Sequence, residues 1–331
     1  MGRLGSVNST SSDAIEKARS ECTFCGECSE GCRFLSKYDI VIGDLEELDG
    51  RKWSCFLCGR CSRVCPQGID GMQVVWDMRF IEAATRGSIK TLRRGGLYCL
   101  EKIRYPFQNY HRAKRLSFFP GCSFLSNLPR TTEKVYELLR ESVDAGIVFD
   151  CCGSPVHELG LGDIASDIVG RLSERFSRHG VEEILTACPH CYELLNGRIP
   201  QKVFTVYDAL TKDQLKPIGE MKLYPPCPDR RMGYPMLESL KGLLSHKPSL
   251  EQRSQCCGLG GNAAREEPEL ASELAMDVAA SDVVSYCASC AYAMDSMAGC
   301  SGRHVLSMLV GVDETADSGT SFSNRVRSKF L

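Results

Sequence analysis

The chain lacks the features that mark membrane-spanning, secreted and nucleic-acid-binding proteins. No apolar run approaches the about 18 residues that a membrane-spanning helix needs, and residues 1–13 contain no hydrophobic region of the signal-peptide kind. The formal net charge is only −2, which gives no overall field that would attract nucleic acid or a membrane. A phosphate-binding G-K-[ST] loop is also missing, so we expect no nucleotide or flavin of the chain's own.

Cysteine is abundant instead, at 20 of 331 residues. A disulfide framework is typical of short secreted chains, whereas this chain is long and shows no secretory signal. So many free thiols favour a reducing compartment, and we expect a cytoplasmic protein, either free or docked on a membrane partner. The length predicts about two domains.

Eight of the cysteines form two copies of the spacing C-x2-C-x2-C-x3-C. The first copy is Cys22, Cys25, Cys28 and Cys32, and the second is Cys55, Cys58, Cys61 and Cys65. Pro66 follows the second copy, whereas Arg33 stands at that position after the first. This is the ligand run of bacterial two-cluster ferredoxins, which hold two four-iron cubanes. A zinc site usually has two separated pairs and does not require the third cysteine.

In this ligand run, three closely spaced thiolates bind one cubane and the fourth cysteine reaches the other. The spacing therefore predicts crossed ligation. One cubane is assigned to Cys22, Cys25, Cys28 and Cys65, and the other to Cys55, Cys58, Cys61 and Cys32. A protein with two such clusters moves electrons.

A second cysteine system repeats over a longer period. Its copies are Cys122, Cys151, Cys152, Cys188 and Cys191, and then Cys227, Cys256, Cys257, Cys287 and Cys290. The first cysteine precedes the adjacent pair by 29 residues in both copies. The copies are offset by 105 residues at the first three positions and by 99 at the last two. An internal period of this kind marks a duplicated structural unit.

The segments around these cysteines alternate between strand and helix patterns. Short apolar runs at 116–121 and 221–226 lead into the first cysteine of each copy. The first copy continues with a helical pattern at 131–143, a strand at 146–149, a helical pattern at 163–178 and a strand at 184–187. The alternation predicts an α/β layer with a largely parallel sheet, with the cysteines at strand ends. Gly153 and Gly258 let the backbone approach a bulky cluster.

The pattern C-x(n)-C-C-G-x(m)-C-x-x-C resembles that of the CCG domain, and it occurs twice after the ferredoxin-type runs. Over residues 15–308 the order of motifs resembles a fused heterodisulfide reductase subunit. The same order occurs in iron–sulfur subunits of glycolate, lactate and anaerobic glycerol-3-phosphate dehydrogenases. The resemblance implies an α-helical dicluster ferredoxin-like domain followed by two tandem α/β CCG domains related by pseudo-two-fold symmetry.

By the same resemblance, each five-cysteine set holds a non-cubane four-iron cluster, with the adjacent pair bridging irons. The residues alone leave two alternatives open, namely a zinc site or an ordinary cubane with one spare thiol. The last pair encloses Pro189-His190 in the first copy and Ala288-Ser289 in the second, so the two sites are expected to differ in potential. Cys99 and Cys300 remain outside all sets and are expected to be inert thiols.

Two histidines lie close to the cysteine motifs in sequence. His190 and His157 are candidate proton donors to a leaving thiolate, or else histidines that support a ligand or lie at the surface. If the repeats are catalytic, Cys152 and Cys257 take part directly, and both sites open into one cleft lined by Pro155, His157, His190 and Asn262. The glycines from Gly258 to Gly261 formally match a dinucleotide fingerprint but lack its strand–turn–helix context.

These motifs predict the domain organisation. We expect a disordered N-terminus at 1–12, a ferredoxin-like domain at 13–85, a connector at 86–115, CCG domains at 116–219 and 220–312, and a disordered tail at 313–331. The connector has nine Lys or Arg residues and one acid, Glu101. It is either a solvated linker or a surface that docks an acidic partner or an anionic membrane.

Two functions remain in view. In the first, the chain is a heterodisulfide reductase-like oxidoreductase subunit that works in a complex, and its electrons pass through two cubanes to two non-cubane clusters that reduce a small-molecule disulfide. A flavoprotein or a membrane cytochrome subunit would supply those electrons. In the second, the chain is the electron-transfer subunit of a flavin-dependent dehydrogenase and delivers electrons to a quinone or another carrier. Neither function involves nucleic acid or a transmembrane segment of the chain itself.

Overall fold

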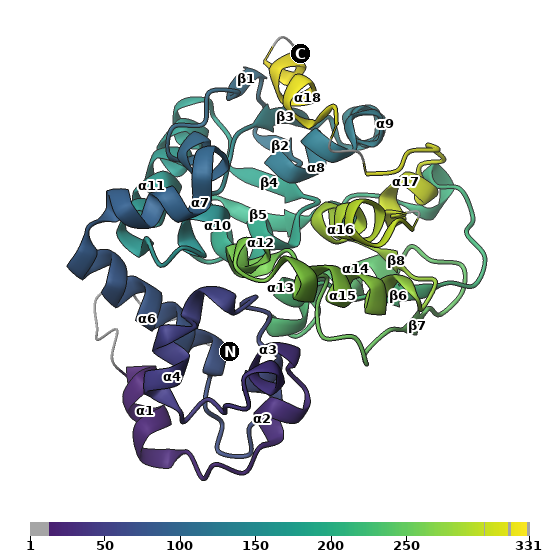
Figure 1. The fold of residues 1–331 in the computed structure, drawn as a ribbon. Helices are drawn as coiled ribbons and strands as arrows, with labels where there is room; N and C mark the ends of the chain where they lie inside the picture. Colours follow the sequence, from purple (N-terminus) through teal and green to yellow (C-terminus); the bar gives the residue numbers. More distant parts are fainter. Residues whose placement is uncertain (1–12, 301, 317–318, 330–331) are drawn as a thin grey trace. The chain divides into compact units, whose positions relative to one another are not determined.

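The computed structural model describes residues 13–300, 302–316 and 319–329 (Figure 1). The chain divides into two compact units that interleave along the sequence. The first unit contains residues 13–103, Pro155–Ser166 and Gln255–Leu274, and the second contains the remaining described residues. The boundaries predicted at 85, 115 and 219 do not coincide with this division. The disorder predicted for 1–12 lies outside the described residues.

The first unit is helical in its described part. Its helices up to residue 103 are α1 (Asp13–Glu21), α2 (Glu27–Glu30), α3 (Arg33–Lys37), α4 (Leu45–Gly50), α5 (Arg60–Val64), α6 (Gly71–Arg86) and α7 (Ser88–Ile103), with a short 3₁₀ turn η1 (Lys52–Ser54). Its later segments contain most of α10 (Ser154–His157) and of α15 (Pro268–Ala279) and the 3₁₀ turn η4 (Gly260–Arg265). Helix α6 begins where the Asp70 carboxylate accepts a hydrogen bond from the backbone N–H of Gln73, as an N-cap does. Ala18, Leu48 and Val74 are completely buried, and they place the core between α1, α4 and α6.

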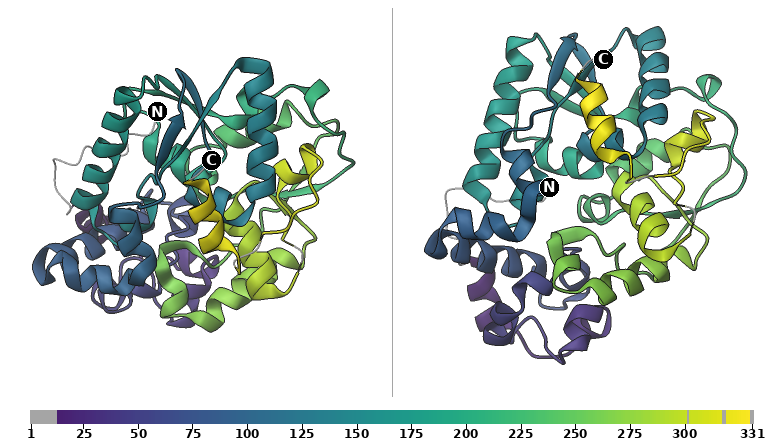
Figure 2. Two further views of the ribbon diagram at one scale, coloured as in Figure 1. Left: turned by 90° about the horizontal axis from the view of Figure 1, so that it is seen from above. Right: turned by 45° about the horizontal axis from the view of Figure 1, so that its top comes forward.

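The second unit contains two sheets, shown from further directions in Figure 2. The larger has the order β1 (Asn109–Arg112), β3 (Gly146–Phe149), β2 (Leu116–Phe119), β4 (Glu183–Thr186) and β5 (Lys202–Thr205). Only β1 runs antiparallel to its neighbour. The smaller is parallel, with the order β7 (Ser249–Leu250), β6 (Lys222–Tyr224) and β8 (Val284–Ser285). β2, the strand before Cys122, lies between β3 and β4, and β6, the strand before Cys227, lies between β7 and β8, so the two copies share this arrangement of three strands.

The larger sheet is buried on both faces. Phe118, Ile147 and Leu185 point into a core that also contains residues of the smaller sheet, such as Leu223 and Val284. Their chain neighbours Phe119, Val148 and Ile184 point the other way, into a second core with α11 (Gly162–Arg178). Side chains alternate between the faces of a strand, so these apolar runs mark strands covered on both sides. The predicted strand at 146–149 and helix at 163–178 are confirmed by β3 and α11.

The predicted connector is not a linker. Residues 86–115 form α7 and β1, and β1 is the edge strand of the larger sheet. Several of its basic side chains are paired within the chain. Arg94 pairs with Glu266, Lys102 with Glu101, Lys114 with Asp144 and Arg115 with Glu183. Lys102 is only 1% exposed, so part of this charge is internal and not a free basic surface.

The predicted disorder of the tail is wrong for its described part. Residues 321–328 form helix α18 (Ser321–Ser328), which packs on α8 (Cys122–Asn127). The Asn324 side-chain amide donates to the backbone O of Ser126 at 2.9 Å, and both partners are buried. The prediction failed because this helix is rich in serine and gains its stability from tertiary contacts, which composition does not reveal. No helix among the described residues has the length and apolarity that crossing a membrane would require.

Candidate metal centres

The two ferredoxin-type cysteine runs have the same backbone conformation. Phe24 and Leu57 stand two residues after the first cysteine of each run, and both have positive φ, 55° and 49°. Gly26 and Gly59 follow the second cysteine of each run, and they too are left-handed, with φ of 84° and 71°. A left-handed residue without glycine's freedom costs about 1–3 kcal/mol and persists where its surroundings demand it. The same left-handed residues in both runs therefore indicate that the two loops present their cysteines in the same way.

The first group of thiols combines both runs. Cys22, Cys25 and Cys28 of the first run and Cys65 of the second line one small hollow. Val41, Ile42 and Ile69 provide its apolar wall. Burial raises the pKa of the Cys28 thiol, and hydrogen bonding to the Ile42 backbone opposes that rise. The structure thus brings together the four cysteines that the spacing assigns to one cubane.

The second group also combines both runs. Burial raises the pKa of Cys61, and the nearby thiolates of Cys55, Cys32 and Cys58 raise it further. Burial likewise raises the pKa of Cys32, with Cys58 as the next cause. The pKa of Cys55 is raised to about 11 by burial, against the lowering effect of the Arg79 charge. These side chains are therefore neutral thiols when nothing is bound, and a metal that binds them as thiolates has to supply the compensating positive charge.

Both groups fit a four-iron cluster by the chemistry of their donors, four convergent cysteine sulfurs each. The packing around the sulfurs is close, because a Cβ at Gly71 would lie 2.8 Å from the sulfur of Cys61. In the described ranges, no group of three or more Cys, His, Asp or Glu side chains is close enough to hold a single metal ion. A single zinc ion needs sulfur ligands at about 2.3 Å, whereas a cubane spreads its ligands over four irons.

Crossed ligation makes a prediction for Cys65. The variant Cys65→Ser should damage the cubane held by Cys22, Cys25 and Cys28, although Cys65 belongs to the other run, because its side chain lines that hollow. Electron paramagnetic resonance (EPR) spectra of the dithionite-reduced protein should show which cubane has changed, with Cys32→Ser as the reciprocal control. Damage confined to the cubane of Cys55, Cys58 and Cys61 would contradict the assignment.

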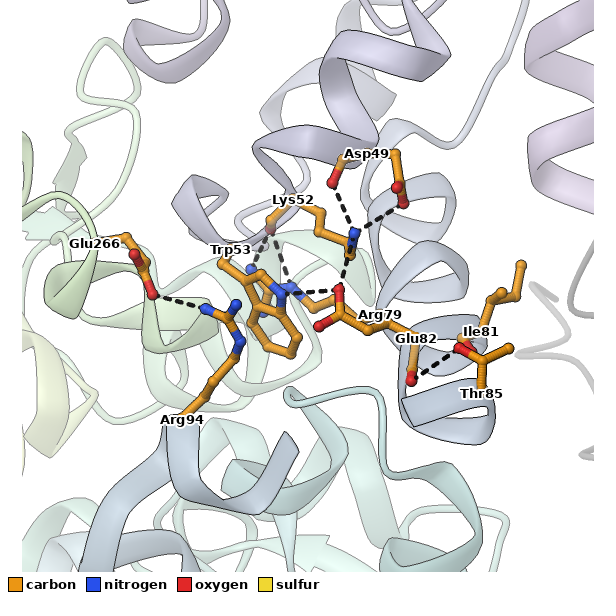
Figure 3. Close-up of polar contacts among 9 residues, drawn as sticks. All are labelled: Asp49, Lys52, Trp53, Arg79, Ile81, Glu82, Thr85, Arg94 and Glu266. Carbon is orange, nitrogen blue, oxygen red and sulfur yellow. Dashed lines mark hydrogen bonds and ion pairs between the residues drawn. The ribbon is translucent and has the colours of Figure 1, made fainter. Parts of the chain in front are cut away.

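A buried arginine, Arg79, contacts the backbone of Cys55 in the second group, and Figure 3 shows it beside Lys52 and Trp53. Arg79 on α6 is completely buried and donates to the backbone carbonyls of Lys52, Cys55, Glu158 and Gly261 at 2.6–3.1 Å. Its guanidinium lies 4.7 Å from the Trp53 ring, and Arg94 stacks at the same distance from that ring. Burial lowers the pKa of Arg79 to about 10, so it stays charged near neutrality. The Arg79 side chain thus hydrogen-bonds the Cys55 loop and also the segments that follow the pairs Cys151-Cys152 and Cys256-Cys257.

The first CCG set is gathered at the ends of three neighbouring strands of the larger sheet. Cys122 begins α8 after β2, Cys151 and Cys152 follow β3, and Cys188 precedes α12 (Pro189–Leu195) after β4. The sulfur of Cys122 lies 3.7 Å from that of Cys151, and the sulfur of Cys191 lies 3.4 Å from that of Cys152.

The thiols of this set differ in their pKa values, because those that accept a hydrogen bond are lowered and the donor Cys191 is raised. Hydrogen bonds from Cys151 and then Cys191 lower the pKa of Cys152 to about 6. A Cβ at Gly121 would lie 3.0 Å from the sulfur of Cys191, which leaves room only for glycine. Val326 of α18 packs beside Cys122 and Cys151, so the tail helix covers part of the set. Five thiols converge here, in keeping with a multi-iron cluster.

The second CCG set is divided between the units. Cys227, Cys287 and Cys290 belong to the second unit, and Cys256 and Cys257 belong to the first. The Arg230 guanidinium donates to the sulfur of Cys227 at 3.1 Å and to the Tyr224 hydroxyl at 2.9 Å. Leu125 occupies the equivalent position of the first copy. A cation on one sulfur and a leucine at the other site make the two surroundings electrostatically different.

The two copies meet around their fourth cysteines, Cys188 and Cys287, which are equivalent positions of the duplication. A hydrogen bond from Cys191 lowers the pKa of Cys188, whereas the nearby Cys287 thiolate raises it and the His190 charge lowers it. A hydrogen bond from Cys290 lowers the pKa of Cys287 to about 6, and His190 lowers it as well. His190 therefore lies close to one cysteine of each copy.

The helices that follow these cysteines make reciprocal contacts. Helix α8 of the first copy contacts α16 (Ala288–Ala298) of the second, and α13 (Cys227–Arg231) of the second contacts α12 of the first. Ser123 and Ser289 share a hydrogen bond of 3.0 Å. Arg231 forms a bidentate ion pair with Glu193 at 2.6–2.7 Å.

The other predicted site residues have structural partners. The His157 ring stacks on Trp76 at 4.8 Å, and Asn262 donates to the backbone O of Arg94 at 2.9 Å. The backbone O of Pro155 accepts from the Cys99 thiol at 3.7 Å. These residues lie in the first unit, whereas His190 lies in the second. Cys99 is buried and Cys300 is exposed.

Sequence reasoning missed three polar residues that contact the cysteine sites, namely Arg79, Arg230 and Gln255. Arg230 could have been suspected from its place three residues after Cys227 on a helix. Arg79 has no such signal, because its acceptors are carbonyls far away in the chain. Gln255 precedes a cysteine pair, but nothing local shows where its side chain points.

Comparison with known proteins places the cysteine repeat in a family. Residues 116–196 and 222–295 match the CCG cysteine-rich domain. The chain is 28% identical over 276 residues to one subunit of the fumarate reductase (CoM/CoB) of Methanothermobacter marburgensis, covering 73% of this chain and 56% of that protein. It is 24% identical over 289 residues to one subunit of the dihydromethanophenazine:CoB–CoM heterodisulfide reductase of Methanosarcina acetivorans, covering 72% and 69%.

A third relative is the EtfAB:quinone oxidoreductase of Syntrophomonas wolfei, 27% identical over 210 residues that cover 53% of this chain and 29% of that protein. The chain thus spans about half the length of several curated relatives that it matches. No solved structure gives a significant match. Two segments of the chain thus match the CCG cysteine-rich domain, and the chain is similar to subunits of heterodisulfide and fumarate reductases and to a protein named as an iron–sulfur protein.

Proposed function

We propose that the chain is the iron–sulfur subunit of a heterodisulfide reductase-like complex and that it reduces a small-molecule disulfide. The observation that carries this proposal is the meeting of the two copies beside their cysteines, where Ser123, next to Cys122, shares a hydrogen bond of 3.0 Å with Ser289, which stands between Cys287 and Cys290. A protein that only relays electrons does not need two complete cysteine-rich sets with a histidine between them. The similarity to one of the heterodisulfide reductase subunits supports the same function.

The reaction has a stoichiometry that suits a paired site. Breaking one disulfide consumes two electrons and two protons and yields two thiols. Iron–sulfur clusters bound by Cys122, Cys151, Cys152, Cys188 and Cys191, and by Cys227, Cys256, Cys257, Cys287 and Cys290, would exchange one electron each. His190 follows Cys188 by two residues, and the Ser154 hydroxyl lies 3.4 Å from its Nδ1. In this proposal His190 protonates a leaving thiolate.

The reciprocal helix contacts support a pseudo-two-fold axis between the copies. A two-fold axis makes each contact occur twice with the roles exchanged, as in an isologous dimer. The contacts of α8 with α16 and of α13 with α12 follow that pattern, because α8 and α13 are equivalent, as are α12 and α16. Such an axis would bring equivalent strand ends to one place, where a single disulfide could meet both sites.

The direct test is an assay of the anaerobically purified protein with reduced viologen as electron donor and a small disulfide as acceptor. Viologen oxidation that depends on the disulfide supports the proposal. Viologen oxidation with a quinone, and none with disulfides, favours a second candidate, an electron-transfer subunit that passes electrons from a flavin-dependent dehydrogenase to a quinone. The similarity to an EtfAB:quinone oxidoreductase is the observation that favours this second candidate.

The proposal fixes an iron content. Two cubanes and two non-cubane four-iron clusters together hold about sixteen irons per chain. Iron and acid-labile sulfide analysis of anaerobically prepared protein should give that value. A value near eight together with bound zinc would remove the non-cubane assignment, because zinc would then occupy the cysteine-rich sets.

The proposal also specifies the surroundings of the chain. The electrons would come from a flavoprotein or a membrane cytochrome subunit, because the chain contains no nucleotide-binding motif. Thiol-rich sites require a reducing and anaerobic compartment, which places the protein in the cytoplasm or on a membrane partner facing it.

A further inference from the structure

One buried side chain connects a ferredoxin-type group to a cysteine pair of the CCG repeat. Gln255 is 6% exposed and immediately precedes Cys256 and Cys257. Its Oε1 accepts the backbone N–H of Arg33 at 2.8 Å. Its Nε2 lies 3.5 Å from the sulfur of Cys32 and 3.6 Å from the sulfur of Cys58. All of these residues belong to the first unit.

The direction of the Gln255 amide is determined by its partners. The backbone N–H of Arg33 can only donate, so the amide oxygen must face it. The amide nitrogen, which carries two donors, then faces the two sulfurs. A buried amide is normally hydrogen-bonded at both ends, and here the acceptors for its N–H groups are cysteine sulfurs.

We propose that Gln255 is a positioning residue that raises the reduction potential of the cubane held by Cys55, Cys58, Cys61 and Cys32. The inference rests on the proposed presence of that cubane. One-electron reduction adds negative charge to a cluster and its sulfurs. Hydrogen bonds from N–H groups to those sulfurs stabilise the more negative state, and they are one of the means by which a protein sets the potential of such a cluster.

The duplicated sequence shows that this contact is specific to the second copy. Asp150 is the residue equivalent to Gln255 in the first copy, directly before Cys151. Its carboxylate accepts the Tyr110 hydroxyl at 2.7 Å, Arg175 Nε at 2.8 Å and the backbone N–H of Cys151 at 2.8 Å. Asp150 is therefore bound within the second unit by groups other than ferredoxin-type cysteines. An amide replaces this carboxylate only in the copy whose cysteine pair folds with the first unit.

The position gives Gln255 a second consequence. Its side chain touches two sulfurs of the cubane group, and its backbone continues directly into Cys256. A cluster bound by Cys256 and Cys257 is thus joined to the cubane by one hydrogen bond and an unbroken covalent path. Gln255 thus both tunes the cubane and connects that cubane to the second CCG set. The first CCG set has no equivalent connection through Asp150.

The test is a redox titration of the whole protein, followed by EPR under anaerobic conditions. In Gln255→Leu the N–H donors are lost, and we expect the equilibrium constant for reduction of this cubane to fall about tenfold, which is about 59 mV for one electron. Gln255→Glu keeps the acceptor for the backbone N–H of Arg33 but places a negative charge at the sulfurs. The reduction potential of this cubane should therefore fall further in Gln255→Glu than in Gln255→Leu. The cubane of Cys22, Cys25, Cys28 and Cys65 should not change in either variant.

Gln201→Leu is the matched control. Gln201 is a similarly buried amide, 7% exposed, that bonds to Ser173 and Ser177 in the second unit, so both cubane potentials should stay as in the wild type. Unchanged potentials in Gln255→Leu and Gln255→Glu, at full iron content, would overturn the inference. So would equal shifts of both cubanes, which would indicate a general structural effect. Wild-type protein without two cubane signals would instead refute the proposed function on which the inference rests.

Discussion

Replacing Cys152 or Cys257 by alanine is expected to abolish disulfide reduction, while both ferredoxin-type cubanes remain reducible by dithionite. Each of these residues is the second member of an adjacent cysteine pair, and they are 3% and 7% exposed. Their thiolates are proposed to hold the clusters at which the disulfide is broken, whereas they belong to neither cubane group. Disulfide-dependent viologen oxidation measures the activity, and EPR of the reduced protein measures the cubanes.

The matched control is Cys300→Ala, because Cys300 is exposed and stands outside every cysteine set. It should retain wild-type activity and both cubane signals. If Cys152→Ala and Cys257→Ala keep substantial activity, the paired-site mechanism is wrong. If only Cys257→Ala is inactive, one copy performs the chemistry and the other has a structural or relay role.

Replacing Arg79 by methionine should cause the largest loss of stability among single changes away from the cysteines. Methionine fills a similar volume but removes a donor from four backbone carbonyls, of which that of Lys52 keeps the Cys55 N–H, and each carbonyl left unsatisfied costs about 1–3 kcal/mol. We expect a total loss of about 3–5 kcal/mol, as for removing one partner of a buried charged network. Arg79→Lys should not restore stability, because one ammonium cannot reach acceptors that a planar guanidinium spans.

Arg94→Met provides the comparison for this prediction. Arg94 stacks on the same Trp53 ring (Figure 3) but is partly exposed, and its ion pair with Glu266 lies at the surface. Exposed pairs contribute about 0–1 kcal/mol, so this variant should be almost as stable as the wild type. Anaerobic urea unfolding, followed by circular dichroism and by the absorbance of the clusters, would measure both variants. Equal midpoints for Arg79→Met and Arg94→Met would contradict the role given to Arg79.

The cysteine spacing alone predicted which thiols the structure brings together in the first unit. It grouped Cys65 with the first run and Cys32 with the second, and the structure places them there. This was possible because three cysteines at steps of three residues are typical ligands of one cubane, whereas the fourth cysteine of such a run ligates the other cluster. The strands of the first CCG copy were equally readable, since apolar runs such as 146–149 end directly at cysteines.

Local sequence could not reveal contacts that depend on tertiary structure. The serine-rich α18 looked disordered because its partners, such as Ser126, lie far away in the chain. The positively charged segment 86–115 looked like a linker because its acidic partners, such as Glu266, are distant in sequence. In both cases composition reports the average solvation of a segment and not the specific neighbours that stabilise it.

The sequence by itself indicated iron–sulfur chemistry, because iron–sulfur clusters are bound by cysteines at particular short spacings, and these spacings can be read directly from the chain. It also revealed the duplication, whereas the order of the strands in each sheet came from the structure. Only the tertiary structure decided that the pair Cys256-Cys257 folds with the first unit, that Arg79 donates to the backbone carbonyl of Cys55 and that the Gln255 amide lies against the sulfurs of Cys32 and Cys58. These contacts are single hydrogen bonds between segments far apart in the chain, and such bonds leave no periodic pattern in the sequence.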